Sequence, residues 1–221
     1  MTSLRNMAAA LLIGAAAVPA TAGPVSWTNW TTVTDALAVV GALDVDGTAV
    51  DVTFTGISSF VQTSGGTNYW SPSSPYISAA VDNAPPATDI IGLNTGGRAT
   101  IRFSQAVVDP LVALVSWNNN TVDFGVPIEV LSFGAGYWGS GTPVLNAAGT
   151  GFFGSGEVHG VIRLPGTYDS ISFTHTSENW HGLTIGVTAL ADGGNPVPEP
   201  ASLALVGLAL AGLTLTRRSR R

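Results

Sequence analysis

The chain has 221 residues, of which 45% are hydrophobic and 10% charged, and its formal net charge is −6. All eight basic residues are arginine and five of them lie near the chain ends, so the segment 23–200 carries three arginines against fourteen acids, a net charge of −11. A surface that acidic argues against nucleic acid or anionic lipid as a partner. Cysteine is absent, which excludes disulfides, thiolate metal sites and a cysteine nucleophile.

The N-terminus has the organisation of a secretory signal peptide. Arg5 precedes an apolar stretch, residues 7–18, and the small residues Ala20 and Ala22 stand at the cleavage positions. This order is typical of signal peptides, and the apolar stretch is too short to cross a bilayer. We therefore expect the protein to be exported, with the secretion translocon and signal peptidase as partners. Cleavage after Ala22 would remove residues 1–22.

The body, residues 23–192, has the pattern of one all-β domain. Apolar and polar residues alternate in four segments, which contain Val50, Val52 and Phe54; Ile101 and Phe103; Ile171 and Phe173; and Leu183, Ile185 and Val187. Alternation predicts half-buried strands, and the nearly continuous apolar run 111–117 predicts a strand buried on both faces. With further runs at 126–132 and 158–164, roughly eight to ten strands are expected. We expect an antiparallel β-sandwich, jelly-roll-like.

Asp44, Asp46 and Asp51 begin like a calcium-binding loop and are candidate metal ligands. An EF-hand needs glycine at the sixth position of its loop, where this chain has Ala49. Asp46 followed by Gly47 between two strand-like runs is instead typical of a hairpin turn. We favour the hairpin and expect no cofactor, with calcium as the alternative.

The segment 64–86 is long and rich in Ser, Pro and Gly, and a loop of that length inside a compact domain is often functional. Aromatic residues in loop-like segments are the candidate ligand-binding residues: Tyr69, Trp70, Tyr76, Tyr137 and Trp138. Exposed aromatic patches mark interaction sites, and flat rings hold sugars in many sandwiches. Such rings also close the open ends of a sandwich, and both roles stay open here. Three others are expected in the core: Trp117, Phe124 and Phe173.

No enzyme motif stands out. Residues 154–156, Gly-Ser-Gly, lack the first glycine of the Gly-x-Ser-x-Gly elbow. His175, Glu178 and His181 are spaced three residues apart, but the spacing of a zincin is absent, which favours ordinary strand and turn residues. We expect a non-enzymatic protein without catalytic residues. The alternatives are a secreted carbohydrate-active hydrolase with paired carboxylates and a calcium-stabilised adhesion module.

The C-terminus has three parts, preceded by a flexible linker at 193–196. Pro198, Glu199 and Pro200 come first, then an apolar run at 201–215, and finally a basic stop made of Arg217, Arg218, Arg220 and Arg221. The prolines prevent a helix from continuing upstream. The run predicts an apolar helix of about 23 Å, short of a hydrocarbon core of about 30 Å. The arginines favour a cytoplasmic end, which places the body outside the inner membrane.

This order resembles the PEP-CTERM sorting tag of bacterial surface and exopolysaccharide-associated proteins. The resemblance covers residues 197–221, about a tenth of the chain. It implies that exosortase, a membrane-embedded cysteine transpeptidase, recognises Pro198, Glu199 and Pro200 and cleaves near them. The protein would pass through the inner membrane, held transiently by 201–216, and reach the cell surface or extracellular matrix. We expect a structural or adhesive component of an exopolysaccharide layer, with polysaccharide as a candidate ligand. A tail anchor that is never cut is the alternative.

Overall fold

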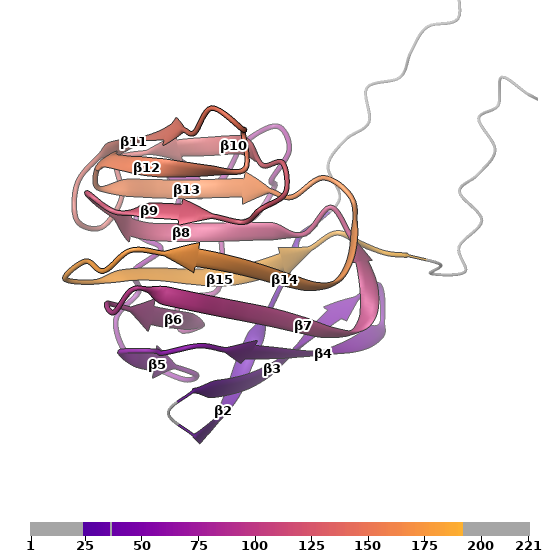
Figure 1. The fold of residues 1–221 in the computed structure, drawn as a ribbon. Coiled ribbons are helices and arrows are strands. Elements are labelled where there is room, and N and C mark those ends of the chain that lie inside the picture. The colour runs from indigo at the N-terminus through magenta and orange to yellow at the C-terminus, as the bar shows by residue number, and fades with distance from the viewer. Residues whose placement is uncertain (1–23, 36, 192–221) are drawn as a thin grey trace, which may run out of the picture. The chain divides into compact units, whose positions relative to one another are not determined.

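The computed structural model describes residues 24–35 and 37–191, which form an all-β body (Figure 1). This part of the chain contains sixteen strands and one short 3-10 helix, η1 (Ser74–Tyr76). The predicted all-β class is therefore confirmed for these residues. The predicted signal segment 1–22, the linker 193–196 and the tail 197–221, including both terminal helices, lie outside the described residues.

Seven antiparallel strands form the first sheet, called sheet A. Its order is β10 (Glu129–Gly134), β13 (Val158–Arg163), β8 (Leu111–Trp117), β15 (His181–Val187), β6 (Ile90–Leu93) and β5 (Phe60–Gln62), with β1 (Ser26–Trp27) also paired to β15. Strand β8 lies between β13 and β15, and all of its residues are buried. The prediction of a strand buried on both faces at 111–117 is confirmed.

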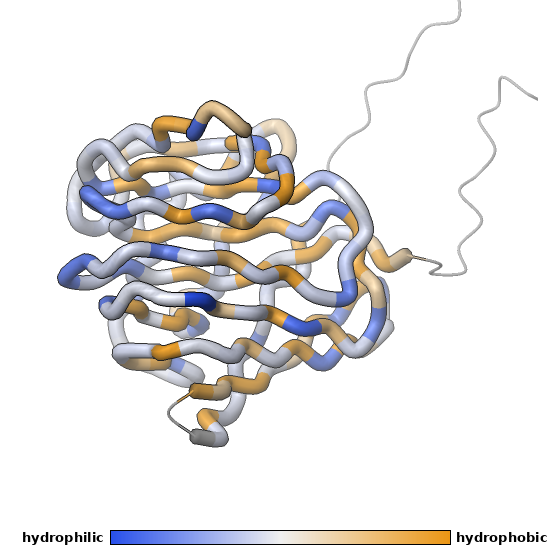
Figure 2. The backbone as a smooth tube through the Cα atoms, viewed as in Figure 1, coloured by the Kyte–Doolittle hydropathy of each residue, from blue (hydrophilic) through white to orange (hydrophobic). Residues whose placement is uncertain are grey.

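Nine antiparallel strands form the second sheet, called sheet B. Its order is β11 (Gly141–Leu145), β12 (Gly151–Gly156), β9 (Thr121–Asp123), β14 (Thr167–His175), β7 (Gly97–Val108), β4 (Thr48–Thr55), β3 (Ala38–Val45) and β2 (Asn29–Asp35), with β16 (Ala189–Leu190) paired to β7. Apolar and polar residues alternate along strands such as β7 (Figure 2). Three of the four alternating segments therefore became strands with one buried face, β4, β7 and β14. The fourth, which contains Leu183, Ile185 and Val187, became β15, and the prediction of a half-buried strand is wrong there because every residue of β15 is buried. Trp27 and Val25 cover its second face at Gly186.

The sixteen strands of the described residues exceed the predicted eight to ten. Four of them, β1, β5, β9 and β16, have only two or three residues, too few for a periodic signal. The run expected at 126–132 is also displaced, since β10 begins at Glu129. Gly125 has a φ of 67° and Pro127 has no backbone N–H, so the chain turns there before it can pair.

The main core lies between the two sheets. One buried cluster contains sheet A residues such as Leu114 and Ile185 together with sheet B residues such as Phe54 and Ile101. The two sheets therefore pack against each other. The three aromatics predicted for the core are all in this cluster: Trp117, Phe124 and Phe173.

Candidate ligand-binding surface

A long loop, residues 63–89, covers the outer face of sheet A. Trp70, Tyr76 and Val81 of this loop join Val115 of β8 and Val161 of β13 in a second buried cluster. Trp70 and Tyr76, two of the predicted ligand-binding aromatics, are only 2% and 0% exposed. Their rings meet edge to face at 5.2 Å. These two side chains close this side of the body and offer no open ring face to a ligand.

The other three predicted aromatics, Tyr69, Tyr137 and Trp138, are joined by Phe60 and Trp180. Trp180 stacks on Phe60 at 5.4 Å, and Tyr69 lies 4.9 Å from Trp180 between ring centroids. Tyr69 is 5.1 Å from Tyr137, which is 5.0 Å from Trp138. We call these five residues the aromatic ridge. Trp138 is 57% and Tyr137 42% exposed, so the ridge has open ring faces on which a ligand can stack.

Glycine makes room for the Trp180 end of the ridge. Gly92 of β6 and Gly182 of β15 are cross-strand partners. A Cβ at Gly92 would lie 2.3 Å from Phe60 Cε1 and 2.8 Å from Trp180 Nε1. Any larger residue would displace both rings, so Phe60 and Trp180 rest directly on the backbone of sheet A.

The other end of the ridge is a tight turn between β10 and β11. The N–H of Gly136 donates to the carbonyl of Gly139 at 2.7 Å, and Tyr137 and Trp138 form the tip. A Cβ at Gly136 would lie 2.2 Å from His159 Cγ. The turn can therefore sit on His159 only because position 136 has no side chain, and this contact fixes where the two exposed rings lie.

His159 is a buried support beneath that turn. It is 0% exposed, and its Nδ1 lies 3.2 Å from the hydroxyl of Tyr76. Burial lowers the pKa of His159 to about 4, against the opposing effect of the Glu157 carboxylate. Burial also raises the pKa of Tyr76. Near neutral pH both groups are therefore uncharged, as a hydrogen-bonded pair under an apolar cover requires.

Glu157 places a carboxylate beside the same end of the ridge. Its Cγ lies 3.6 Å from the position that a Cβ of Gly139 would take. Its side chain accepts hydrogen bonds from the hydroxyl of Ser116 and from Asn118 Nδ2, the latter at 2.8 Å. Both donors are neutral, so they hold the carboxylate in place without cancelling its charge.

His175, Glu178 and His181 come together as a hydrogen-bonded chain, whose two imidazole rings contact Trp117 in the core between the sheets. His181 Nδ1 lies 3.1 Å from Glu178 Oε2, and His181 Nε2 lies 3.0 Å from His175 Nδ1. With neutral imidazoles, His181 donates to the carboxylate and accepts from His175. The histidine nitrogens therefore hydrogen-bond to each other and to Glu178, and they do not point toward one common position. Among residues 24–35 and 37–191, no group of three or more His, Asp or Glu is placed to hold a metal ion.

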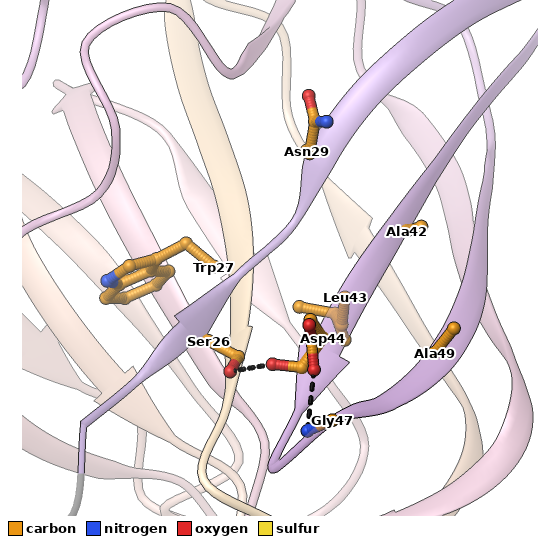
Figure 3. Close-up of a pocket in the computed structure, with 8 residues that line it drawn as sticks. All are labelled: Ser26, Trp27, Asn29, Ala42, Leu43, Asp44, Gly47 and Ala49. Carbon is orange, nitrogen blue, oxygen red and sulfur yellow. Dashed lines mark hydrogen bonds between the residues drawn. The ribbon is translucent and has the colours of Figure 1, made fainter.

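The predicted Asp-Gly hairpin is confirmed. Asp46 and Gly47 form the turn between β3 and β4, with φ of 51° and 82°. Beside it, Asp44 lines a depression of about 390 Å³ (Figure 3). Its carboxylate accepts the N–H of Gly47 at 2.8 Å, and its carbonyl accepts the hydroxyl of Ser26. Of the three candidate calcium ligands, Asp44 lines this depression, whereas Asp46 and Asp51 do not.

Two residues of the ridge, Phe60 and Trp180, were not predicted. Phe60 belongs to the three-residue strand β5, which has no periodic signal. Trp180 follows the polar residues 177–179 directly before β15. An aromatic residue in a polar turn next to a strand was the available signal, and it applied equally to Tyr137 and Trp138.

The described residues contain no helix that is long and apolar enough to cross a membrane. The apolar segment predicted at 201–216 lies outside these residues. The aromatic ridge belongs to the described residues, whereas the tail is identified by comparison with known families.

The family model of the PEP-CTERM protein-sorting motif matches residues 196–221. This segment contains Pro198, Glu199, Pro200 and the terminal arginines, so the predicted sorting tag is confirmed. The motif implies recognition by exosortase and export to the cell envelope or surface. No curated protein and no solved structure matches the chain. The match covers the tail alone.

Proposed function

We propose that the body is a non-enzymatic structural or adhesive module that holds polysaccharide on the aromatic ridge, in the extracellular layer to which the tag delivers it. The aromatic ridge carries this proposal. Five contiguous rings include two exposed members, Tyr137 and Trp138, and each exposed ring offers an apolar face on which a sugar ring can stack. An exported protein of an exopolysaccharide layer meets such ligands at high concentration.

The strand order supports a jelly-roll β-sandwich as the scaffold. The order β6-β15-β8-β13 in sheet A accompanies β7-β14-β9-β12 in sheet B. From β6 to β10 successive strands alternate between the sheets, and they do so again from β12 to β16. Alternation of this kind is the signature of two interlocked Greek keys. In this scaffold the ridge occupies the outer side of sheet A, and its supports Gly92 and Gly182 are rigid strand positions.

The hydrogen bonds of the carboxylates nearest the ridge support a binding function over hydrolysis. Glu157 is held by Ser116 and Asn118, and Glu178 by His181. A glycosidase needs two carboxyl groups that face the scissile bond together. Here each carboxylate is instead engaged in its own hydrogen bonds, and the His181 partner of Glu178 packs on Trp117 in the core between the sheets.

Processing follows from the two ends of the chain. The signal segment 1–22 directs the chain to the translocon and is removed by signal peptidase. The segment 201–216 holds the chain in the inner membrane until exosortase cuts near Pro198–Pro200. Intact mass of the protein from its native host tests this sequence of events. Loss of 1–22 and of the residues beyond the motif is expected, and a mature protein that retains Arg221 would contradict processing.

Co-sedimentation of the full chain with extracellular polysaccharide from its host tests the binding. Trp138→Ala removes the most exposed ring of the ridge and is expected to weaken binding about tenfold, or about 1.4 kcal/mol. Phe153→Ala is the matched control, because Phe153 is a 40% exposed ring on β12 of sheet B. Equal binding by the three proteins would exclude the ridge as the binding surface.

A further inference from the structure

The described residues carry a large excess of negative charge. The described residues contain twelve acids and three arginines, a net charge of −9. Arg98 and Arg102 lie on β7 of sheet B, and Arg163 pairs with Glu129. No arginine among the described residues makes an ion pair or ring contact with a member of the ridge. A polyanionic glycan would therefore approach this surface against the field of the protein.

One carboxylate completes the ridge at its exposed end. Glu157 lies against the turn that carries Tyr137 and Trp138. The carboxylate of Glu178 is instead bonded to His181, whose ring packs on Trp117 in the core between the sheets. Beside Glu157 lie the faces of the exposed rings, whose π-electrons attract cations. A carboxylate and aromatic faces together form the combination that proteins use to bind ammonium groups.

We infer that the ridge is specific for a polymer of amino sugars with free amines, a cationic glycan, and prefers it over neutral and uronic-acid glycans. This inference rests on the proposed function and names its ligand class. The sugar rings stack on the aromatic faces, and the ammonium groups lie over the rings or against Glu157. A neutral glycan makes only the stacking contacts. A uronic-acid glycan adds repulsion from the Glu157 carboxylate.

The test compares binding of the purified full chain to chitosan, cellulose and alginate, which are a cationic, a neutral and an anionic polysaccharide. At low salt we expect chitosan to bind at least about tenfold more tightly than cellulose, and alginate not to bind. The preference should disappear at about 1 M salt, where the screening length is about 3 Å. The variant Glu157→Gln should bind chitosan only as well as cellulose.

Two controls separate the ridge from the overall charge. Asp169→Asn removes an exposed carboxylate on β14 of sheet B and should keep the full preference for chitosan. Trp138→Ala should weaken binding to chitosan and cellulose alike. A preference that survives in Glu157→Gln, equal binding of chitosan and cellulose by the unaltered protein, or tighter binding of alginate would overturn this inference and leave the proposed function standing. Absence of binding to all three polysaccharides and to the host polysaccharide would overturn both.

Discussion

His181 Nε2 lies 3.0 Å from His175 Nδ1, and this contact joins β15 of sheet A to β14 of sheet B. The two rings are 0% and 8% exposed, and the Trp117 ring lies 4.3 Å from that of His181. A polar link therefore crosses the apolar core between the sheets. Protonation of His175 would put a charge in this core beside a second imidazole, so the link depends on pH.

Acidification is expected to destabilise the body. In an unfolded chain the pKa of histidine is about 6.5, whereas in the folded protein burial, and then His181, lowers the pKa of His175 to about 4. Between these values the unfolded chain binds more protons. The contribution of His175 to the free energy of unfolding is therefore fully present above about pH 6.5. It is lost as the pH decreases, and the loss levels off below about pH 4. Urea unfolding at several pH values should show that the free energy of unfolding falls by at most about 3 kcal/mol because of His175.

A variant isolates the contribution of His175 from other titrating groups. Burial lowers the pKa of His159 to about 4 as well, so part of the pH dependence remains when His175 is replaced. His175→Gln keeps hydrogen-bonding capacity and should show a shallower loss of stability than the wild type between pH 6.5 and 4. The same slope in both proteins would refute a folded-state pKa shift at His175.

Gly136→Ala should destabilise the body by about 1–3 kcal/mol, because overpacked side chains force shifts of this cost. The new Cβ would lie 2.2 Å from Cγ of the buried His159. Gly97→Ala is the control, since nothing lies within 4 Å of a Cβ there, and it should change stability by less than about 0.5 kcal/mol. Thermal unfolding measures both variants. Equal melting temperatures would mean that the turn does not rest on His159.

Trp117→Phe is expected to lower the stability of the body. Trp138→Ala is expected to lower glycan binding and to leave stability nearly unchanged. Trp117 is fully buried and its Nε1–H donates to the Gly182 carbonyl at 2.9 Å. Its replacement leaves a cavity and an unpaired acceptor, at a cost of about 2–4 kcal/mol. Trp138→Ala removes an exposed ring and should stay within about 0.5 kcal/mol of the wild type while glycan binding falls. A large loss of stability in Trp138→Ala would place this ring among the structural residues.

Removal of calcium with a chelator is expected to leave the melting temperature unchanged. The Asp44 carboxylate accepts the Gly47 N–H, and Asp46 and Gly47 adopt the positive φ values that the turn requires. A ligand that binds the folded state alone raises its stability with ligand concentration. A fall of several degrees in chelator would therefore establish a calcium-stabilised module in place of the cofactor-free one expected here.

Local patterns predicted much of the fold. The apolar run 111–117 became β8, and Val50, Val52 and Phe54 became the buried face of β4. Asp46 formed its turn because the conformation depends on adjacent residues. These features were predictable because hydrophobic periodicity and turn-forming residues determine the structure over only a few positions.

The ridge was only half predictable because it is assembled from distant segments. Tyr69 and Trp70 are neighbours in sequence, yet one joins the ridge and the other is 2% exposed. What separates them is the outer face of sheet A, which Trp70 covers and which no local pattern encodes. Phe60 and Trp180 meet for the same reason, since β5 and β15 both flank β6.

Hydroxyl-radical footprinting of the full chain, with and without polysaccharide from the host's extracellular layer, tests whether the aromatic ridge is the binding surface. Mass spectrometry then reports protection residue by residue. Binding on the aromatic ridge predicts reduced oxidation of Trp138, Tyr137 and Tyr69, with Phe153 unchanged. Unaltered oxidation of the ridge in saturating polysaccharide, or protection centred on Phe153, would contradict it.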